Sequence, residues 1–253
     1  MTAARSRPLL GLVVPALLLG WWSLWSLGAT ATVFAPLDEV AATFLRELRD
    51  GQLLSDATTT VSRALTGFTL GASAGVLLGV AMAMSRPLEA TVGPLFHALR
   101  QVPLLGWLPL IGLWLGNGDE AKLVMISLAA FYPSMLNAFA GVSGVDRKYG
   151  EVAEVYGFDA EQRFFRVLLP AASPMILTGL SQALAFAWIG TIGSELLLGT
   201  GSGLGATLAM GQAQQRMDIV LVAVATTGAL GFALNSALLS ARKRLLRWQP
   251  VAN

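Results

Sequence analysis

Two ionisable residues, Arg100 and Glu195, lie inside long apolar runs of this sequence and are the first candidates for a functional role. Placing a charged side chain at the centre of a bilayer costs at least ~2.5–3.5 kcal/mol on insertion scales, so a charge kept there has either a function or a partner. For Arg100 we weigh a cationic station along the path of a small anion against an interfacial residue or a structural ion pair. The same alternatives hold for Glu195, which lies near the end of its run.

Uncharged side chains on the same apolar runs extend this set of candidates. Three amide side chains can form hydrogen bonds to a passing solute, and a proline and a tryptophan lie on the same run as Arg100. The residues that we expect to line a path are Arg100, Gln101, Pro103, Trp107, Asn137, Gln182 and Glu195.

Residues for covalent, acid–base or metal chemistry are scarce. Cysteine is absent, which excludes thiolate metal sites and a cysteine nucleophile, and His97 is the only histidine. There is no G-x-x-x-x-G-K-[ST] pattern, so we expect no ATP chemistry, no metal and no cofactor in this chain. The glycine run at 199–206 matches G-x-G-x-x-A, but it follows an apolar run rather than a strand, and we interpret it as a flexible extracytoplasmic loop. Ser202 in that run has no histidine nearby, which disfavours a serine hydrolase.

The composition is that of an integral membrane protein. Hydrophobic residues make up 55% of the chain and charged residues only 13%, whereas a soluble domain has about 25% charged residues. So few charges cannot cover a globular surface, which implies contact with a lipid bilayer. The net charge of +2 is small and no basic stretch is interleaved with aromatic residues, so a nucleic acid partner is not expected.

Six runs are long enough to cross a bilayer, which needs about 20 mostly apolar residues. They cover about 9–28, 61–84, 91–115, 121–143, 174–198 and 218–240, and we interpret 1–253 as a single transmembrane domain. A cleaved signal peptide is the alternative for the first run, because Ala-Thr-Ala follows at 29–31. The length of that run and its residues Trp21, Trp22 and Trp25 favour a retained helix. The expected fold class is therefore an all-α integral membrane protein.

Lysine and arginine are unevenly divided between the segments that join these runs. With the N-terminus in the cytoplasm, the inside segments carry Arg5, Arg7, Arg86, Arg147, Lys148, Arg163, Arg166, Arg242, Lys243, Arg244 and Arg247. The outside segments carry only Arg46, Arg49, Lys122 and Arg216, set among acidic residues. This bias places both termini in the cytoplasm.

Small residues and prolines distinguish the second and third runs. Glycines at 67, 71, 75 and 79 form one helical stripe, which we expect to pack against another helix of the same chain rather than against a second subunit. The third run contains Pro94, Pro103 and Pro109, and each proline removes a backbone donor. Because freed carbonyl groups survive at membrane depth only against protein or water, this run is the best candidate to line a path, with a kinked packing helix as the alternative.

The segment 144–172 is too polar to cross a membrane, and the charge bias puts it in the cytoplasm. Residues 147–156 have the composition of a helix, with Val152, Val155 and Tyr156 at the spacing of an apolar face. Gly157 follows where a helix often ends in a left-handed residue. Asp159 and a glutamine three residues later then predict a capping box at the start of a second helix.

The second short helix leads back to the fifth run. Its aromatic residues continue an apolar face, and Pro170 is expected to end it. Ser173 and Pro174 are the expected N-cap and first-turn proline of the fifth span. The unit would be charged on its outer face and apolar on its inner face. A helix resting on lipid is the alternative, but the mixture of acids and bases favours a protein partner.

One pattern in this segment resembles the "EAA" loop of ABC importer membrane subunits, which reads Glu-Ala-Ala, three residues, Gly, nine residues, Ile, one residue, Leu-Pro. The matching residues here are Glu151, Val152, Ala153, Gly157, Val167, Leu169 and Pro170. The two departures, valine for alanine and valine for isoleucine, are conservative. Within that family, the stretches 99–122 and 193–205 resemble the nitrate/sulfonate/taurine group of permeases, and the likeness covers nearly the whole chain.

The resemblance implies a complex of several proteins, with this chain in the bacterial inner membrane. Two copies of the permease, a homodimer, would surround the path of a small solute, such as nitrate, taurine or an alkanesulfonate. Two copies of a separate ATPase subunit would hold ATP and Mg²⁺ and contact the loop, and an extracytoplasmic binding protein would deliver the solute. The loop residues expected at the ATPase contact are Glu151, Ala153, Tyr156, Gly157, Phe158, Asp159, Leu169 and Pro170.

Three other functions were weighed against this one. An ABC permease for a different class of solute fits the same motifs. An ion-driven secondary carrier would have broken helices in both halves of the chain, whereas the prolines here concentrate in one run. A membrane enzyme is disfavoured because the apolar runs lack sets of acids, bases and nucleophiles.

Overall fold

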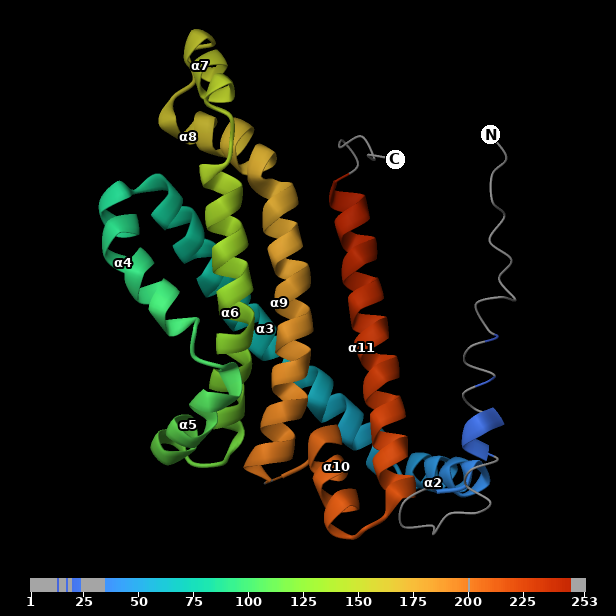
Figure 1. Cartoon of the computed structure of the whole chain (residues 1–253). Helices are drawn as coiled ribbons and strands as arrows, with labels where there is room; N and C mark the ends of the chain where they lie inside the picture. The colour runs from blue at the N-terminus through green and yellow to red at the C-terminus, as the bar shows by residue number, and fades with distance from the viewer. Residues whose placement is uncertain (1–12, 14–16, 18–19, 24–34, 200, 247–253) are drawn as a thin grey trace, which may run out of the picture.

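The computed structural model describes residues 13, 17, 20–23, 35–199 and 201–246, and all of its regular elements are helices (Figure 1). The expected all-α fold is therefore confirmed for this part of the chain. Its centre is formed by three long helices, α3 (Gln52–Met84), α6 (Asp119–Ser143) and α9 (Leu169–Leu198). The first expected span, 9–28, lies almost entirely outside the described residues.

The glycine stripe of α3 packs against α6 of the same chain, as predicted. A Cβ atom added at Gly75 would lie 2.6 Å from the carbonyl oxygen of Phe131, and one added at Gly71 would overlap the carbonyl oxygen of Ser127. Small alanine and isoleucine side chains of α3, α6 and α9 then form the centre of the bundle. Because no side chain separates the two backbones, α3 and α6 approach as closely as two helices can in lipid.

The helix α3 is longer than the expected span 61–84, because it begins at Gln52. Its 33 residues span about 50 Å at 1.5 Å per residue, whereas a bilayer core is about 30 Å thick. Figure 1 accordingly shows α3 crossing the bundle diagonally. The added turns carry polar side chains, and those of Asp56 and Thr60 are buried against other helices. Hydropathy alone could not assign these turns to the helix.

The third expected span is broken, which corrects the prediction of one helix over 91–115. It consists of α4 (Arg86–Leu99), a 3-10 turn η1 (Leu104–Trp107) and α5 (Leu108–Leu115), and the two halves meet at 92°. Pro103 adopts an extended conformation at the break, with φ −54° and ψ 133°. A proline also disfavours helical conformation in the residue before it, so the helix ends a few residues earlier.

Four helices in the described part of the chain are long and apolar enough to cross a membrane, and the bent pair makes up to five. The four are Gln52–Met84, Asp119–Ser143, Ala160–Leu198 and Met217–Leu245, the last being α11. With the first run outside the described residues, the count of six remains a prediction.

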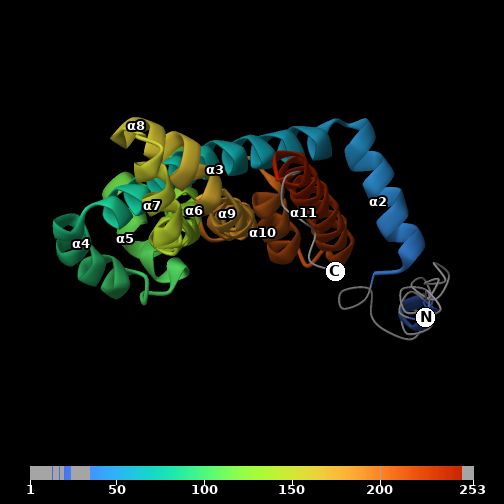
Figure 2. The ribbon, with the colours of Figure 1, turned by 90° about the horizontal axis from the view of Figure 1, so that it is seen from above.

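Two further helices lie at the end of the bundle that also holds α5, which we call the distal end. The first is α2 (Leu37–Arg49), which was not predicted and lies at the edge of the bundle, beyond α11 (Figure 2). The second is α10 (Leu204–Ala213), so the predicted glycine loop is helical from Leu204 onwards. The hydroxyl group of Thr43 in α2 donates a buried hydrogen bond of 2.7 Å to Asp218 in α11. This bond fixes α2 to the bundle.

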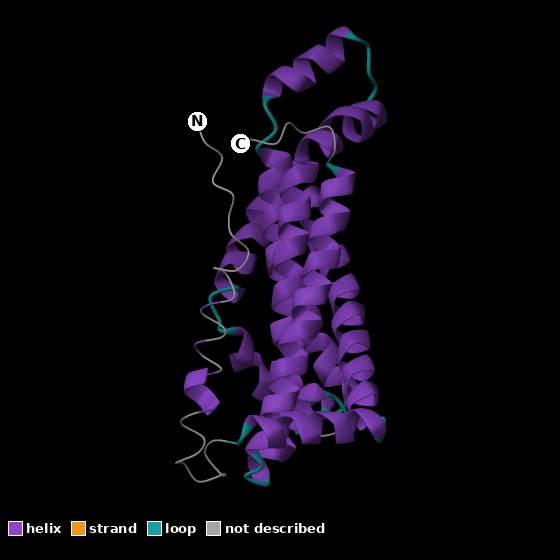
Figure 3. Ribbon diagram, turned by 90° about the vertical axis from the view of Figure 1, so that its right-hand side faces the viewer, coloured by secondary structure: helices purple, strands orange, loops and turns teal. Residues whose placement is uncertain are grey.

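The opposite end of the molecule carries α7 (Arg147–Val155) and α8 (Ala160–Arg163), which extend beyond the long helices (Figure 3). A π-helical turn η2 (Phe164–Leu168) joins α8 directly to α9. Pro170 therefore lies in the first turn of α9 and does not end a helix, and Pro174 lies inside α9 rather than at its start. Because the π turn widens the hydrogen-bond ladder just before Pro170, the proline is accommodated and the chain stays helical from Ala160 to Leu198.

Candidate functional site

The corner between α7 and α8 is built from local hydrogen bonds. Gly157 has a φ of +69°, as predicted for the residue that ends α7. Its backbone N–H donates to the carbonyl of Glu154 at 2.9 Å, and that of Phe158 donates to the carbonyl of Ala153 at 3.0 Å. These two bonds form a Schellman motif, which caps the open carbonyl groups of α7.

The start of α8 confirms the predicted capping box. The Asp159 carboxylate accepts from the backbone N–H of Gln162 at 2.7 Å, and the Gln162 side chain accepts from the backbone N–H of Asp159 at 3.3 Å. An ion pair of 3.0 Å between Arg163 and Glu154 then joins the two helices across the corner. With both helix ends capped and the arms linked, the corner forms one unit.

The apolar side chains of this unit face outwards, contrary to the expected apolar inner face. Val155 is 87% exposed, Tyr156 75% and Val152 54%. Ala153, at 2% exposure, is the buried residue of α7, which packs on η2. Glu154 and Arg163 pair with each other across the corner. The exposed apolar side chains are therefore the ones available to a partner protein. We call this exposed surface of α7 the corner face.

The remaining predicted loop residues surround the corner face. Glu151 is exposed, Leu169 is half-buried, and Pro170 lines a hollow of about 740 Å³ between α7 and the start of α9. Tyr149 and Phe158 line the same hollow, and the guanidinium of Arg166 lies 5.9 Å from the centre of the Phe158 ring. Protruding apolar side chains beside a hollow make this end of the molecule suitable for docking a protein.

Five of the predicted path residues come together near the break in the third span. Arg100, Gln101, Pro103 and Gln182 line a hollow of about 460 Å³, which we call the break hollow. Asn137 lies behind it and donates a hydrogen bond of 3.0 Å to Gln182. The hollow is at the level of Pro133 and Gln182, which lie near the middle of α6 and α9.

The other two path candidates lie elsewhere. Trp107 packs in an apolar cluster near the distal end with Leu108 and Met125. The Glu195 side chain is fully buried, 2.9 Å from the Arg63 guanidinium. The structure therefore does not bring these two residues to the break hollow, and a role for either of them in the path remains a prediction.

Glu195 belongs to a buried polar network that the sequence analysis missed. It also accepts hydrogen bonds from Thr60, at 2.9 Å, and from the backbone N–H of Gly205, at 3.0 Å. Arg63 extends the network to Asp119, at 2.6 Å. The signal was present in the sequence, because Arg63 lies on the face of α3 that carries the glycine stripe. At the edge of the distal end, the hydrogen bond that the Arg216 guanidinium donates to Asp218 raises the pKa of Arg216.

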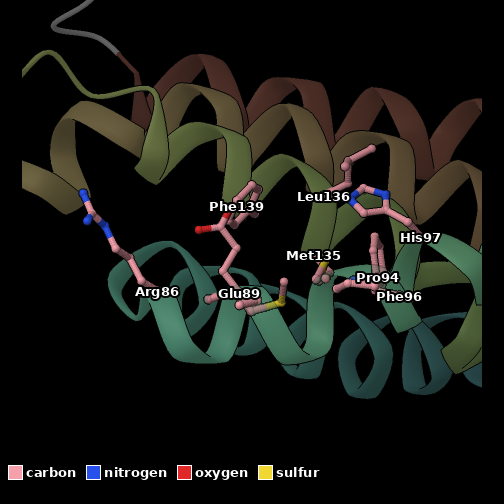
Figure 4. Close-up of a pocket in the computed structure, with 11 residues that line it drawn as sticks. Arg86, Glu89, Pro94, Phe96, His97, Met135, Leu136 and Phe139 are labelled. Atoms are coloured by element: carbon pink, nitrogen blue, oxygen red, sulfur yellow. The ribbon is translucent and has the colours of Figure 1, made fainter.

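A second hollow lies beside the break hollow, between α4 and α6, and Leu136 lines both. Its volume is about 560 Å³. Figure 4 shows His97 at one end of this hollow and Arg86 at the other, with Glu89 and Phe139 between them. The two hollows thus share α6, with α4 lining the second hollow and α9 lining the break hollow.

Comparisons with known proteins agree on one family. Residues 71–247 match the family described as "Binding-protein-dependent transport system inner membrane component". The chain is 33% identical to the putative aliphatic sulfonates transport permease protein SsuC of Bacillus subtilis, over 94% of this chain and 87% of that protein. It is 32% identical to the taurine transport system permease protein TauC of Escherichia coli, over 92% and 86%. A bicarbonate transport system permease protein, CmpB of Synechococcus elongatus, is 27% identical over 85% and 81%.

Solved structures share the fold. A chain in the crystal structure of an amino acid ABC transporter with histidines superposes with a TM-score of 0.65 at 20% identity, covering 79% of this chain and 98% of that chain. A chain of the MetNI methionine ABC transporter in an inward-facing conformation gives 0.64 at 16% identity, covering 77% and 96%. At these identities the likeness concerns the arrangement of helices alone.

Proposed function

Because the chain belongs to the binding-protein-dependent transport system inner membrane component family, it is the membrane-spanning permease subunit of an ABC importer, and we propose that its solute is a small sulfonate or a related oxyanion. The substrate class rests on relatives named for aliphatic sulfonates, taurine and bicarbonate. Nitrate, a trigonal oxyanion like bicarbonate, falls in this class. The lining of the break hollow supports an anion, because in the described part of the chain it includes Arg100 and no carboxylate.

A separate ATPase subunit is the proposed partner of the corner face. The observation that carries this proposal is the exposure of Val155 and Tyr156 on a corner whose two helix ends are capped. Exposed aromatic and aliphatic side chains beside a hollow are typical anchors of a protein interface. The sequence has no phosphate-binding G-x-x-x-x-G-K-[ST] pattern, so ATP and Mg²⁺ are assigned to the partner.

The corner face is proposed to lie in the cytoplasm, together with both chain termini. Arg147, Lys148 and the basic end of α11 lie at this end of the bundle, whereas the distal end mixes its few cations with acids. This is the distribution expected of a positive cytoplasmic side. An extracytoplasmic binding protein would then dock at the distal end.

A second permease copy, forming a homodimer, is proposed on the side of the break hollow. Arg100, Gln101 and Gln182 are exposed there in the isolated chain, near the middle of the long helices. Charged and polar groups at this depth face a bundle interior or water rather than lipid. A second copy would cover this side and enclose the path between the two chains.

The coupling role is tested by a pair of glycine variants. Gly157 and Gly51 both have positive φ, +69° and +77°, and neither has an atom within 4 Å of an added Cβ. Valine costs each site roughly 1–2 kcal/mol of backbone strain, but only Gly157 lies at the corner. We expect Gly157→Val to lose co-purification of the ATPase and solute uptake, and Gly51→Val to keep both.

The measurement is made in membranes that contain the permease, the ATPase and the binding protein. The permease alone should show no ATP hydrolysis, and activity should appear when the ATPase subunit is added. Wild-type levels of ATPase association and uptake in Gly157→Val would refute the assignment of the corner. Equal loss in Gly51→Val would show a general folding defect instead.

A further inference from the structure

The break hollow presents hydrogen-bond donors at the middle of the long helices. Its lining includes Arg100, Gln101 and Gln182, which come from two segments far apart in the sequence and carry a guanidinium and two amide groups. The other lining residues are apolar, apart from Tyr132. Among the residues that the structure describes, no aspartate or glutamate lines this hollow beside Arg100.

A neighbouring asparagine fixes the orientation of the Gln182 amide. The nitrogen atom Nδ2 of Asn137 lies 2.8 Å from the carbonyl oxygen of Pro133, and a carbonyl can only accept. The atom must therefore be the NH₂ group rather than the amide oxygen. The same NH₂ group lies 3.0 Å from Oε1 of Gln182 and donates its second hydrogen there.

This arrangement decides which part of Gln182 is available to a solute. Its oxygen atom is engaged by Asn137, so its own NH₂ group, with two donors, is left for the hollow. Asn137 is 8% exposed and is held by α6, so it orients Gln182 from behind and does not itself meet the solute. The result is a cation and a fixed amide donor beside one space, and the described residues that line it include no carboxylate to repel an anion.

We propose that the break hollow is an oxyanion-binding subsite in the translocation path, formed by Arg100 and the NH₂ group of Gln182, with Asn137 as a positioning residue. The ligand is a small anion with two or three oxygen acceptors, such as a sulfonate, nitrate or bicarbonate. A guanidinium can meet two of those oxygens at once, and the amide a third. This inference rests on the proposed transport of a small oxyanion and names the residues that would recognise it.

The test uses the absence of cysteine from the chain. A single cysteine replaces Val102, which lines the hollow and is 39% exposed. The complete complex, without ATP, is treated with anionic sulfonatoethyl methanethiosulfonate and, separately, with cationic trimethylammonioethyl methanethiosulfonate. Because a cationic cleft raises the encounter rate of anions by roughly 10–10³-fold, we expect the anionic reagent to react at least about tenfold faster, after each rate is divided by that reagent's rate with a free thiol in solution.

Three further variants assign that preference to individual groups. Arg100→Gln and Gln182→Leu should each bring the ratio of the two rates towards one. Arg86→Gln, which removes a cation from the neighbouring hollow, should leave the ratio unchanged. Asn137→Leu should lower the ratio when Gln182 is present and have no further effect in the Gln182→Leu background. An effect of Asn137→Leu in both backgrounds would show a merely structural role.

The outcomes separate this proposal from the proposed function. No reaction of the Val102→Cys complex with either reagent would mean that the hollow faces lipid, and equal rates would mean that it has no anion preference; either result overturns the subsite. Uptake of taurine, methanesulfonate, nitrate and bicarbonate is measured in the same membranes. If none is taken up while the anion preference persists, the subsite stands and the proposed substrate class fails.

Discussion

At the scale of single residues, Glu195 illustrates how a charge is kept in an apolar environment. Its carboxylate has no exposed surface and meets Arg63, the Thr60 hydroxyl and a backbone N–H. These partners come from α3 and from the start of α10, so they connect parts of the chain that are distant in sequence. Such a group stabilises the fold only while every partner is present, because a buried carboxylate without its cation is strongly unfavourable.

Removing Arg63 should therefore destabilise the chain more than removing the whole pair. Breaking a buried ion pair from one side costs about 3–5 kcal/mol, whereas replacing both members by apolar residues is often close to neutral. We expect a large fall in the melting temperature of purified Arg63→Met in detergent, and partial recovery in the Arg63→Met, Glu195→Leu double variant. A double variant no more stable than Arg63→Met would contradict this account of the network.

The corner face is also a matter of single residues, because only a few exposed side chains form it. Val155 is the most exposed of them, at 87%, and packs on nothing in the isolated chain. Val155→Asp should therefore leave the melting temperature of the permease unchanged and weaken its association with the ATPase at least about tenfold, a loss of ~1.4 kcal/mol. Pull-down of the ATPase at graded concentrations measures this, and Glu120→Lys, an exposed charge change at the distal end, is the control. Unchanged association would exclude Val155 from the interface.

At the scale of elements, α3 and α6 pack closely because the glycines of α3 place no side chain between the two backbones. The stripe from Gly67 to Gly79 brings the α3 backbone against the α6 backbone, and the network of Arg63 continues the same face towards the distal end. One face of α3 therefore combines close packing at membrane depth with polar contacts beyond it. A methyl group in the stripe would separate the helices and also disturb the polar contacts.

A matched pair of glycine-to-alanine variants tests this packing. An added Cβ at Gly71 would overlap the Ser127 carbonyl, whereas none lies within 4 Å of one at Gly228 in α11. Overpacking costs typically about 1–3 kcal/mol, and alanine in an open helical position is favourable by up to about 1 kcal/mol. We expect a lower melting temperature for Gly71→Ala and an equal or higher one for Gly228→Ala. Equal behaviour of the two variants would mean that the stripe is not a close interface.

At the scale of the whole molecule, the two ends differ in the charges and surfaces that they present. The end with α7 and α8 carries the corner face and most of the cations, and the distal end carries α2, α10 and the buried network. The break hollow lies between them. This arrangement places the corner face, the break hollow and the distal end in sequence along the long helices.

The orientation of these ends is open to direct measurement, because the chain has no native cysteine. Single cysteines at Gly118 and Gly201, both exposed at the distal end, should react with an impermeant maleimide added outside intact cells. A cysteine at Asp159 should react only after the membrane is made permeable. Labelling of Asp159→Cys from outside would reverse the assigned topology.

The sequence by itself determined those features that depend on neighbours a few residues apart. The left-handed Gly157, the capping box of Asp159 and the helical stripe of glycines were all predicted, because each rests on hydrogen bonds or spacing within one or two helical turns. The apolar runs likewise gave the all-α membrane fold, since each helix satisfies its own backbone groups in lipid. Local rules failed where a proline was expected to end a helix at Pro170, because the π turn before it had no signal in the sequence.

Only the tertiary structure decided which side chains meet. Asn137 and Gln182 are 45 positions apart, and Arg63 and Glu195 are 132 apart, so neither pair follows from spacing along the chain. The 92° break in the third span was also beyond the sequence, which indicated distortion by prolines but not its angle. That break brings Arg100 to the same hollow as Gln182, while the packing of α3 on α9 removes Glu195 from the path candidates that meet there. Sequence gives each helix its polar groups, and packing selects the ones that face a common space.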